Sequence, residues 1–319
     1  MDVSVLIPTY NQEKYVKETL LSTIFQKTAD ISFEVFVADD ASTDGTLTII
    51  EEVKKSNPEK LNVIRRPENI GLMRNLFSAI EQCNGDYIAI CGGDDIWLPQ
   101  KLQRQVDRIR LGHDCGAIYS CAYTCDKEGK IQCGKNIGTR GADFSRLLKG
   151  NTIPACTVIF RKDLALRYID EVSLFERNWL MEDYPFWLWI SLRSNICFID
   201  EPLAVYRILD NSLSHFTDRK KEKSFSLSRL EIMKFFMEIS GTELPRSFKK
   251  TLLKQQAELT FLEPTTFSID KLRADLMSAE NSDLGMHAKI LLLLSFFPAT
   301  TNYLFQFSGW AKSRLKQLT

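Results

Sequence analysis

Short apolar runs alternate with amphipathic segments through the first third of the chain. The apolar runs cover residues 3–8, 33–39, 61–66 and 87–93. Each run is too short for a helix and has the near-continuous apolar character of a strand that is buried on both faces. Because a segment of helical periodicity follows each run, the pattern predicts a mainly parallel sheet with helices on both faces.

The helical segments are marked by apolar residues that recur every three or four positions. Asn11 is the expected cap of the first helix, a turn cluster at 40–46 opens the second, and Asn84 with Gly85 ends the third. Pro99 suits the first turn of the fourth. The inward positions are Val16, Leu20 and Ile24, then Leu47, Ile50 and Val53, then Leu72, Leu76 and Ile80, and the fourth helix covers residues 99–111.

The pattern becomes less regular after residue 111. Strands are predicted at 116–125, 156–162 and 196–207, separated by short helices, and are expected to add strands of mixed direction to the parallel core. A charged stretch then opens a mostly helical pattern that continues to the last residue. The chain is therefore expected to divide into an α/β domain at 1–215 and a helical region at 216–319.

Polar clusters stand at the ends of three predicted strands, at residues 8–12, 39–45 and 92–95. Ligands bind beyond the carboxyl ends of the strands in open α/β sheets, so the three clusters are expected to form one site. A turn there can contact a base or ribose, and a guanidinium can contact a nucleotide. The candidate nucleotide contacts are Asp39, Asp40 and Arg74.

Two adjacent acids, Asp94 and Asp95, follow the glycine step Gly92-Gly93. Glycine lets the backbone approach a ligand closely. Carboxylate oxygens suit Mg²⁺ or Mn²⁺, and Mg²⁺ is typically held by one or two carboxylates while substrate phosphates complete its shell. The acids are therefore candidate metal ligands. The alternative is that they cap the helix that begins near Pro99.

A second acidic pair, Glu182 and Asp183, precedes an aromatic-rich helix that contains Trp187. A carboxylate beside an aromatic side chain suits a general base near the apolar face of a sugar. The alternative is that the acids cap the helix and the tryptophans lie in the core, and this alternative is favoured for Glu182.

Composition narrows the function classes. Lys+Arg and Asp+Glu both number 41, so no net field favours nucleic acid as a partner. The N-terminus, with Asp2 and a short apolar stretch, lacks the features of a secretion signal. A cytoplasmic protein with eight reduced cysteines is therefore expected. The cluster Cys115, Cys121, Cys125 and Cys133 has spacings that match no common zinc pattern.

Six ordered blocks of this sequence resemble the family 2 glycosyltransferases, which have the GT-A fold. Together the blocks extend over roughly 210 residues, and their order makes the match specific where any single block would be weak. They are "VSVLIPTYNQEKYV" (3–16), "FEVFVADDASTDGT" (33–46), "ENIGLMRN" (68–75), "GDYIAICGGDDIWLPQKL" (85–102), "EDYPFWLWI" (182–190) and "LAVYRILDNSLS" (203–214).

The resemblance implies a GT-A catalytic domain at 1–215, with a nucleotide-binding half at 1–110 and an acceptor half at 111–215. It implies a nucleoside-diphosphate sugar donor (UDP is commonest), Mn²⁺ or Mg²⁺, and inversion at the anomeric carbon. Asp94 matches the metal-binding acid, with Asp95 beside it, and Asp183 matches the base, with Glu182 and Trp187 in the acceptor region. The implied donor contacts are Pro8, Thr9, Tyr10, Asp39, Asp40, Arg74, Gly93, Asp94, Tyr206 and Arg207.

Two positions depart from the family pattern. Gly92 stands where the family's D-x-D has an acid, and Leu209 stands where many relatives have histidine, with His215 nearby but out of register. Both departures favour the alternative of a non-catalytic sugar-nucleotide-binding or scaffold protein, whereas Asp94 and Asp183 favour an enzyme. A nucleotidyltransferase would need a glycine-rich basic phosphate loop near the first strand, and dehydrogenase and P-loop motifs do not occur.

The acceptor is expected to be a saccharide or a lipid-linked sugar in surface polysaccharide synthesis. Residues 290–311 carry no charge and are flanked by Lys289 and Lys312. Polar residues and Pro298 break this stretch, so a pair of helices packed on the domain is expected more than a membrane span. A peripheral anchor on the cytoplasmic face, with "KSRLK" (312–316) on anionic lipid, is the sharper alternative.

Overall fold

The computed structural model describes residues 2–112, 114–209 and 219–241. The chain divides into two units, Met1–His215 and Phe216–Thr319. The described part of the second unit is one helix, α8 (Arg219–Ser240). None of the helices among these described residues combines the length and hydropathy of a membrane span. His215 and the apolar stretch at 290–311 lie outside the described residues.

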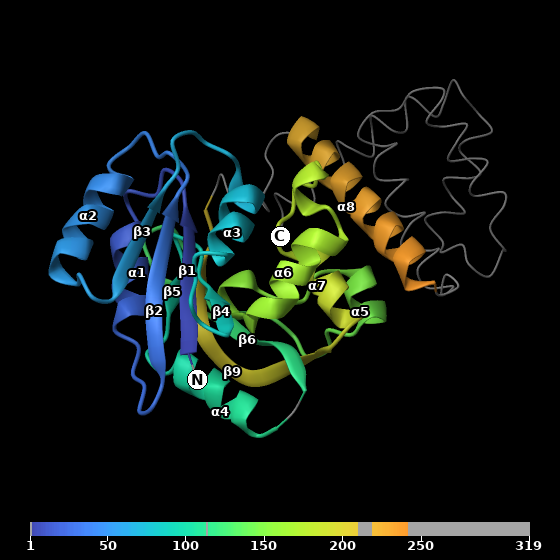
Figure 1. Ribbon diagram of the computed structural model, residues 1–319, viewed down its shortest axis with the longest axis horizontal. Helices are drawn as coiled ribbons and strands as arrows, with labels where there is room; N and C mark the ends of the chain where they lie inside the picture. Colours follow the sequence, from blue (N-terminus) through green and yellow to red (C-terminus); the bar gives the residue numbers. More distant parts are fainter. Residues whose placement is uncertain (1, 113, 210–218, 242–319) are drawn as a thin grey trace. The chain divides into compact units, whose positions relative to one another are not determined.

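The first half of unit 1 is a parallel sheet with helices between successive strands (Figure 1). Its strands lie in the order β3-β2-β1-β4. The predicted strand–helix alternation is confirmed here. The elements are β1 (Asp2–Thr9), α1 (Val16–Ile24), β2 (Ser32–Asp39), α2 (Thr46–Ser56), β3 (Leu61–Arg65), α3 (Leu72–Ile80) and β4 (Tyr87–Ile90).

The second half extends this sheet with strands of mixed direction. The full order is β3-β2-β1-β4-β8-β6-β9-β5, with β7 paired to β6. β8 runs antiparallel to β4 and β6, whereas β6 and β9 are parallel to each other. The elements are β5 (Ile96–Trp97), α4 (Lys101–Arg110), β6 (Cys115–Cys125), β7 (Ile131–Ile137), α5 (Phe144–Lys149), β8 (Ile159–Arg161), α6 (Lys162–Glu171), α7 (Tyr184–Ser191) and β9 (Asn195–Arg207), with short 3₁₀ turns at Ala155–Thr157 and Leu174–Glu176.

Two predicted strands are shorter than expected, and two observed strands, β5 and β7, were missed. The strand expected at 87–93 ends at Ile90, because the chain must leave the sheet to form the acidic turn. The strand expected at 156–162 begins with a 3₁₀ turn and pairs only over Ile159–Arg161. β7 was not predicted because its sequence, "IQCGKNI", is mostly polar and Lys135 interrupts its alternating apolar positions.

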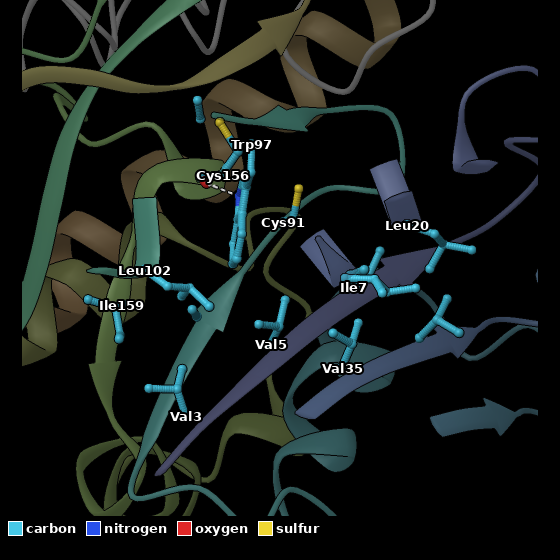
Figure 2. Close-up of a cluster of buried hydrophobic side chains, with 14 of the residues drawn as sticks. Val3, Val5, Ile7, Leu20, Val35, Cys91, Trp97, Leu102, Cys156 and Ile159 are labelled. Carbon is cyan, nitrogen blue, oxygen red and sulfur yellow. Dashed lines mark hydrogen bonds between the residues drawn. The ribbon is translucent and has the colours of Figure 1, made fainter. Parts of the chain in front are cut away.

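The core forms where alternate residues of the central strands face the helices. Val3, Val5 and Ile7 of β1 point to one side of the sheet and pack with Leu20 of α1 and Val35 of β2 (Figure 2). On the same side lies Trp97, whose indole Nε1 donates to the Cys156 carbonyl over 2.8 Å. This bond ties the segment after the acidic turn to the segment that leads into β8.

The expectation that every cysteine is a reduced thiol is wrong for one pair. Cys115 at the start of β6 and Cys197 of β9 form a disulfide, with their Cα atoms 5.8 Å apart. The strand register places Cys197 opposite Ile118, close to a bulge that follows Cys115. Sequence spacing gave no signal for this contact because the pair is 82 residues apart and depends on the parallel pairing of β6 with β9.

Lys101 is a fully buried lysine in the first turn of α4. Its ammonium donates to Gln105 Oε1 over 2.7 Å and lies 3.8 Å from the centre of the Trp97 ring. Burial disfavours the charged form and lowers the pKa of Lys101 to about 7. Lys101 therefore packs against the Trp97 indole, and the free-energy cost of burying its charged form depends on pH.

Replacement of Lys101 by methionine tests this cost. The unfolded chain binds the lysine proton more tightly than the folded chain does, so the wild-type protein gains stability as pH rises from about 7 towards 10.5. Relative to Lys101→Met, the free energy of unfolding should rise by roughly 1.4 kcal/mol per pH unit within that window. Urea unfolding of both proteins at several pH values measures the difference, and parallel pH curves would contradict the assignment.

Candidate active site

The carboxyl ends of β1, β2 and β4 bring the three polar clusters together, as the sequence indicated. Thr9 pairs with Asp39 in the register of β1 and β2. The Thr9 hydroxyl donates to Gln12 Oε1 over 2.8 Å, and both groups lie against Gly93. A Cβ atom at Gly93 would lie 1.9 Å from Gln12 Oε1. The first and third clusters therefore approach closely here, and a larger residue at position 93 would displace the Gln12 amide.

The loops that follow β1 and β2 are interlocked by reciprocal hydrogen bonds. The Asn11 backbone N–H donates to Ser42 Oγ over 2.9 Å, and Asn11 Oδ1 accepts from the Thr43 N–H over 2.8 Å. Glu13 Oε2 accepts from the Gly45 N–H over 2.8 Å. Asn11 has φ of 53°, so it forms a left-handed turn instead of the expected helix cap. These contacts hold together the two loops that follow Thr9 and Asp39.

Asp39 and Asp40 are both buried and both bonded within the protein. The Asp39 carboxylate accepts from the Ser42 N–H over 3.0 Å and from the Ser42 hydroxyl over 2.5 Å. Asp40 accepts from the backbone N–H groups of Ile70 and Gly71, one on each oxygen, both over 2.9 Å. Asp40 therefore fixes the turn before α3 through two backbone donors.

Three other expected donor contacts differ in exposure. Pro8 is buried in β1, whereas Tyr10 is 45% exposed just beyond the strand. Arg74 of α3 is also exposed, and its guanidinium donates to the Phe175 carbonyl and lies 5.7 Å from the Phe175 ring. Arg74 thus links α3 to the segment that precedes α7, and of these three residues Tyr10 and Arg74 are exposed.

Asp94 and Asp95 each place a carboxylate oxygen close to Gly92, and the two acids have different surroundings. A Cβ atom at Gly92 would lie 3.1 Å from Asp94 Oδ1 and 2.9 Å from Asp95 Oδ2, so both carboxylates flank the position where the family pattern has an acid. Asp95 is 5% exposed, and its Oδ1 accepts from the Arg207 backbone N–H over 2.9 Å. Asp94 is only half-buried. Neither acid caps α4, which begins at Lys101 without a side-chain cap.

The pKa values of both acids are raised, and burial is the first cause in each case. For Asp95 the negative charge of Asp94 adds to burial and raises the pKa well above its usual range. For Asp94 burial raises the pKa, and Arg207 and Gln12 partly offset this effect. Two carboxylates that resist ionisation beside each other favour a cation between or beside them.

Arg207 at the end of β9 holds the acidic turn in place. Its side chain is buried, and Nε donates to the Asp94 carbonyl over 2.8 Å. One terminal nitrogen forms an ion pair with Glu18 of α1 over 2.7 Å. The other donates to the carbonyls of Asp126 and Lys127 over 3.4 and 3.5 Å. The Arg207 guanidinium thus contacts three segments of the protein, and Tyr206 beside it is half-buried.

The second acidic pair stands at the start of α7. Asp183 caps this helix by accepting from the Tyr184 N–H over 2.6 Å, and its other oxygen accepts from Asn151 Nδ2 over 2.8 Å. Burial, with the charge of Asp183, raises the pKa of Glu182 to about 8. Burial also raises the pKa of Asp183, opposed by the Tyr184 and Asn151 donors. Asp183 is the cap, so the capping role considered for Glu182 is wrong.

Trp187 has no exposed surface and does not face an acceptor. Its ring packs in the core against Phe160 and Phe186, with ring centres 6.3 and 5.2 Å apart. The alternative that this tryptophan lies in the core therefore describes the structure.

The segment between α5 and β8 connects the two acidic pairs. Asn151 binds Asp183, and five residues later Cys156 lies beside Asp95 and accepts from the Trp97 indole through its carbonyl. Sequence reasoning missed Gln12, Glu18 and Asn151 because each is a lone polar residue with no spacing pattern. These three residues are identified only by their contacts in the folded structure.

The contribution of Arg207 to the stability of the acidic turn can be tested by comparing two variants. Arg207→Met leaves the Asp94 carbonyl without its guanidinium donor, and we expect the free energy of unfolding to fall by roughly 2–3 kcal/mol. Glu18→Gln removes a carboxylate that is 57% exposed, so we expect a loss below about 1 kcal/mol. Urea unfolding measures both, and equal losses would show that the ion pair, and not the buried donor set, holds the turn.

Curated relatives of this chain include an uncharacterized protein and a putative glycosyltransferase. An uncharacterized protein of Mycobacterium tuberculosis is 29% identical over 224 residues, which cover 69% of this chain and 63% of that protein. The putative teichuronic acid biosynthesis glycosyltransferase TuaG of Bacillus subtilis is 27% identical over 238 residues, which cover 73% of this chain and 90% of TuaG. The matched part thus spans less than two thirds of the mycobacterial relative.

Solved structures show the same fold. Staphylococcus aureus TarS (residues 1–349, with UDP-GlcNAc) superposes with a TM-score of 0.62 at 19% identity, covering 96% of this chain and 89% of the TarS chain. A mannosyltransferase of Pyrobaculum calidifontis, in complex with GDP-Man and Mn²⁺, gives 0.55 at 17% identity, covering 99% of this chain and 84% of the other. The predicted GT-A fold is confirmed. Residues 4–168 match the sequence model of glycosyl transferase family 2, and the chain therefore belongs to this family.

Proposed function

We propose that this chain transfers a sugar from a nucleoside-diphosphate donor, with UDP favoured, to an acceptor hydroxyl with inversion at the anomeric carbon. The observation that carries the proposal is the acidic turn at the sheet edge, where Asp94 and Asp95 flank Gly92 beside Thr9 and Gly93. Family membership supports a transferase. The fold neighbours in complex with UDP-GlcNAc and with GDP-Man support a nucleotide-sugar donor.

The acidic turn fits a divalent cation. Asp94 Oδ1 and Asp95 Oδ2 flank the space beside Gly92, and Asp95 Oδ1 is already bonded to the Arg207 N–H. No group of three or more metal-binding side chains occurs among the described residues, so donor phosphates and water would complete the shell. When bound, Mn²⁺ or Mg²⁺ supplies charge neutralisation for the departing diphosphate. The Mn²⁺ complex of the mannosyltransferase supports this choice.

Asp183 is the proposed base. Its carboxylate receives donors from Tyr184 N–H and Asn151, which favour the ionised form. Glu182, with a pKa of about 8, holds its proton near neutral pH and leaves the negative charge to Asp183. Asp183 takes the proton of the acceptor hydroxyl while the acceptor oxygen bonds to the anomeric carbon and the bond to the diphosphate breaks. One base and one stabilised leaving group suffice for a single inverting displacement.

A saccharide or lipid-linked acceptor in surface polysaccharide synthesis is the proposed setting, and the name of TuaG supports it. A cytoplasmic enzyme, peripheral on the membrane, would suit such an acceptor. The second candidate is a non-catalytic sugar-nucleotide-binding protein, which Gly92 favours because the turn has one acid fewer than the family pattern. The next two experiments separate binding from turnover.

Metal-dependent nucleotide binding tests the role of Asp94. We expect UDP with Mn²⁺ to raise the melting temperature more than UDP alone, because a ligand of the folded state stabilises it by mass action. Asp94→Asn should lose the Mn²⁺-dependent part. The matched control is Asp86→Asn, an exposed acid just before β4 at the opposite edge of the sheet, which should keep it. An Asp94→Asn variant that responds like wild type would refute the metal assignment.

Turnover tests the role of Asp183. Asp183→Asn keeps the shape of the side chain but cannot take a proton, so we expect kcat to fall by roughly 10²–10⁴ while donor binding changes little. Glu182→Gln should cost much less. A screen of sugar nucleotides with Mn²⁺, read by released nucleoside diphosphate, provides the assay. Wild-type activity in Asp183→Asn would refute the assignment of Asp183 as the base. A wild-type protein that binds UDP but turns over no donor would support the second candidate.

A further inference from the structure

Asn151 is an exposed asparagine whose side-chain amide is bonded at both ends. It lies in the segment between α5 and the turn at Ala155–Thr157. Its Oδ1 accepts from the Ile153 backbone N–H over 3.0 Å, and its Nδ2 donates to Asp183 Oδ2 over 2.8 Å. Because a backbone N–H can only donate, the amide orientation is determined, and the NH₂ group must face the carboxylate.

The backbone that carries Asn151 is anchored on both sides. Before it, the buried Tyr184 hydroxyl donates to the Leu147 carbonyl over 3.0 Å. After it, the Thr152 hydroxyl donates to the Gly141 carbonyl over 3.1 Å, and Ile153 is buried. Tyr184 is also the residue whose N–H binds Asp183. The same residue of α7 therefore fixes both the carboxylate and the segment that supplies its amide partner.

We propose that Asn151 is a positioning residue for Asp183: its amide turns the carboxylate and holds it in one orientation at the start of α7. The proposal rests on the proposed role of Asp183 as the base. One oxygen of Asp183 is held by the Tyr184 N–H and the other by Asn151, so rotation about the last side-chain bond requires the loss of both contacts. A base held in this way meets the acceptor hydroxyl without a further loss of side-chain freedom.

The same contact affects ionisation. Burial raises the pKa of Asp183, and the Asn151 amide opposes that rise because it donates to the charged form. The titratable neighbours are Glu182 on the same turn and Tyr168 of α6, with Arg177 close to Tyr168. Removal of the amide should therefore raise the pKa of Asp183 further, and the acid limb of the rate profile should move to higher pH.

Two readouts test the proposal on the full chain, with Asn151→Ala as the variant. The first is a ¹³C NMR titration of protein labelled in its aspartate carboxyl carbons, with the Asp183 signal assigned by its loss in Asp183→Asn. We expect this signal to titrate at higher pH in Asn151→Ala than in wild type. The control is Asn195→Ala, which removes an exposed asparagine whose amide donates to the Asp114 carbonyl over 3.1 Å and should leave the titration unchanged.

The second readout is the pH profile of kcat and KM, with UDP-GlcNAc and Mn²⁺ as the first donor. We expect kcat of Asn151→Ala to be about tenfold lower near pH 6, with donor KM unchanged and part of the loss recovered at higher pH. An Asp183 titration in Asn151→Ala that is identical to wild type would overturn the proposal, even if the melting temperature of the variant were lower. Full activity of Asp183→Asn would instead refute the assignment of Asp183 as the base. A shifted Asp183 titration in Asn151→Ala would still show that the Asn151 amide acts on this carboxylate.

Discussion

A single buried guanidinium holds the acidic end of this sheet together. Arg207 binds the Asp94 carbonyl, pairs with Glu18 and reaches two carbonyls of the β6–β7 turn, while its own N–H binds Asp95. Two adjacent carboxylates that are largely removed from water cost several kcal/mol unless they are paired and hydrogen-bonded. The fixed positive charge and the N–H donor offset that cost, so the acids can stay at the ligand-binding edge before any ligand arrives.

Adjacent acids in this protein have different tasks. Asp95 is buried and bonded to the end of β9, while Asp94 stays half-buried beside it. In the other pair, Asp183 and not Glu182 caps α7. The raised pKa of Glu182 keeps that residue protonated and leaves the negative charge to Asp183. In each pair one residue is fixed by the fold and sets the electrostatic environment of its neighbour.

Periodicity predicted the parallel half of the fold well, because buried strands and amphipathic helices are encoded locally. It failed for β7, whose residues are mostly polar, and for the Cys115–Cys197 disulfide, whose partners meet only through the pairing of β6 with β9. Motifs identified candidate residues but did not show which of them are bonded within the protein. Asp40, Asp95 and Arg207 carry motif positions, yet their donors and acceptors are bonded within the protein, a distinction that depends on burial and on contacts distant in sequence.

The central claim is that Asp94 presents the metal ligand while Arg207 keeps Asp95 in a supporting role. Anomalous diffraction from crystals grown with UDP and Mn²⁺ tests it most directly. The account predicts a manganese peak about 2.0–2.6 Å from an Asp94 carboxylate oxygen. In the same crystals, Asp95 Oδ1 should still accept from the Arg207 N–H. A peak bound by Asp95 with that hydrogen bond broken, or a peak far from Gly92, would contradict the account.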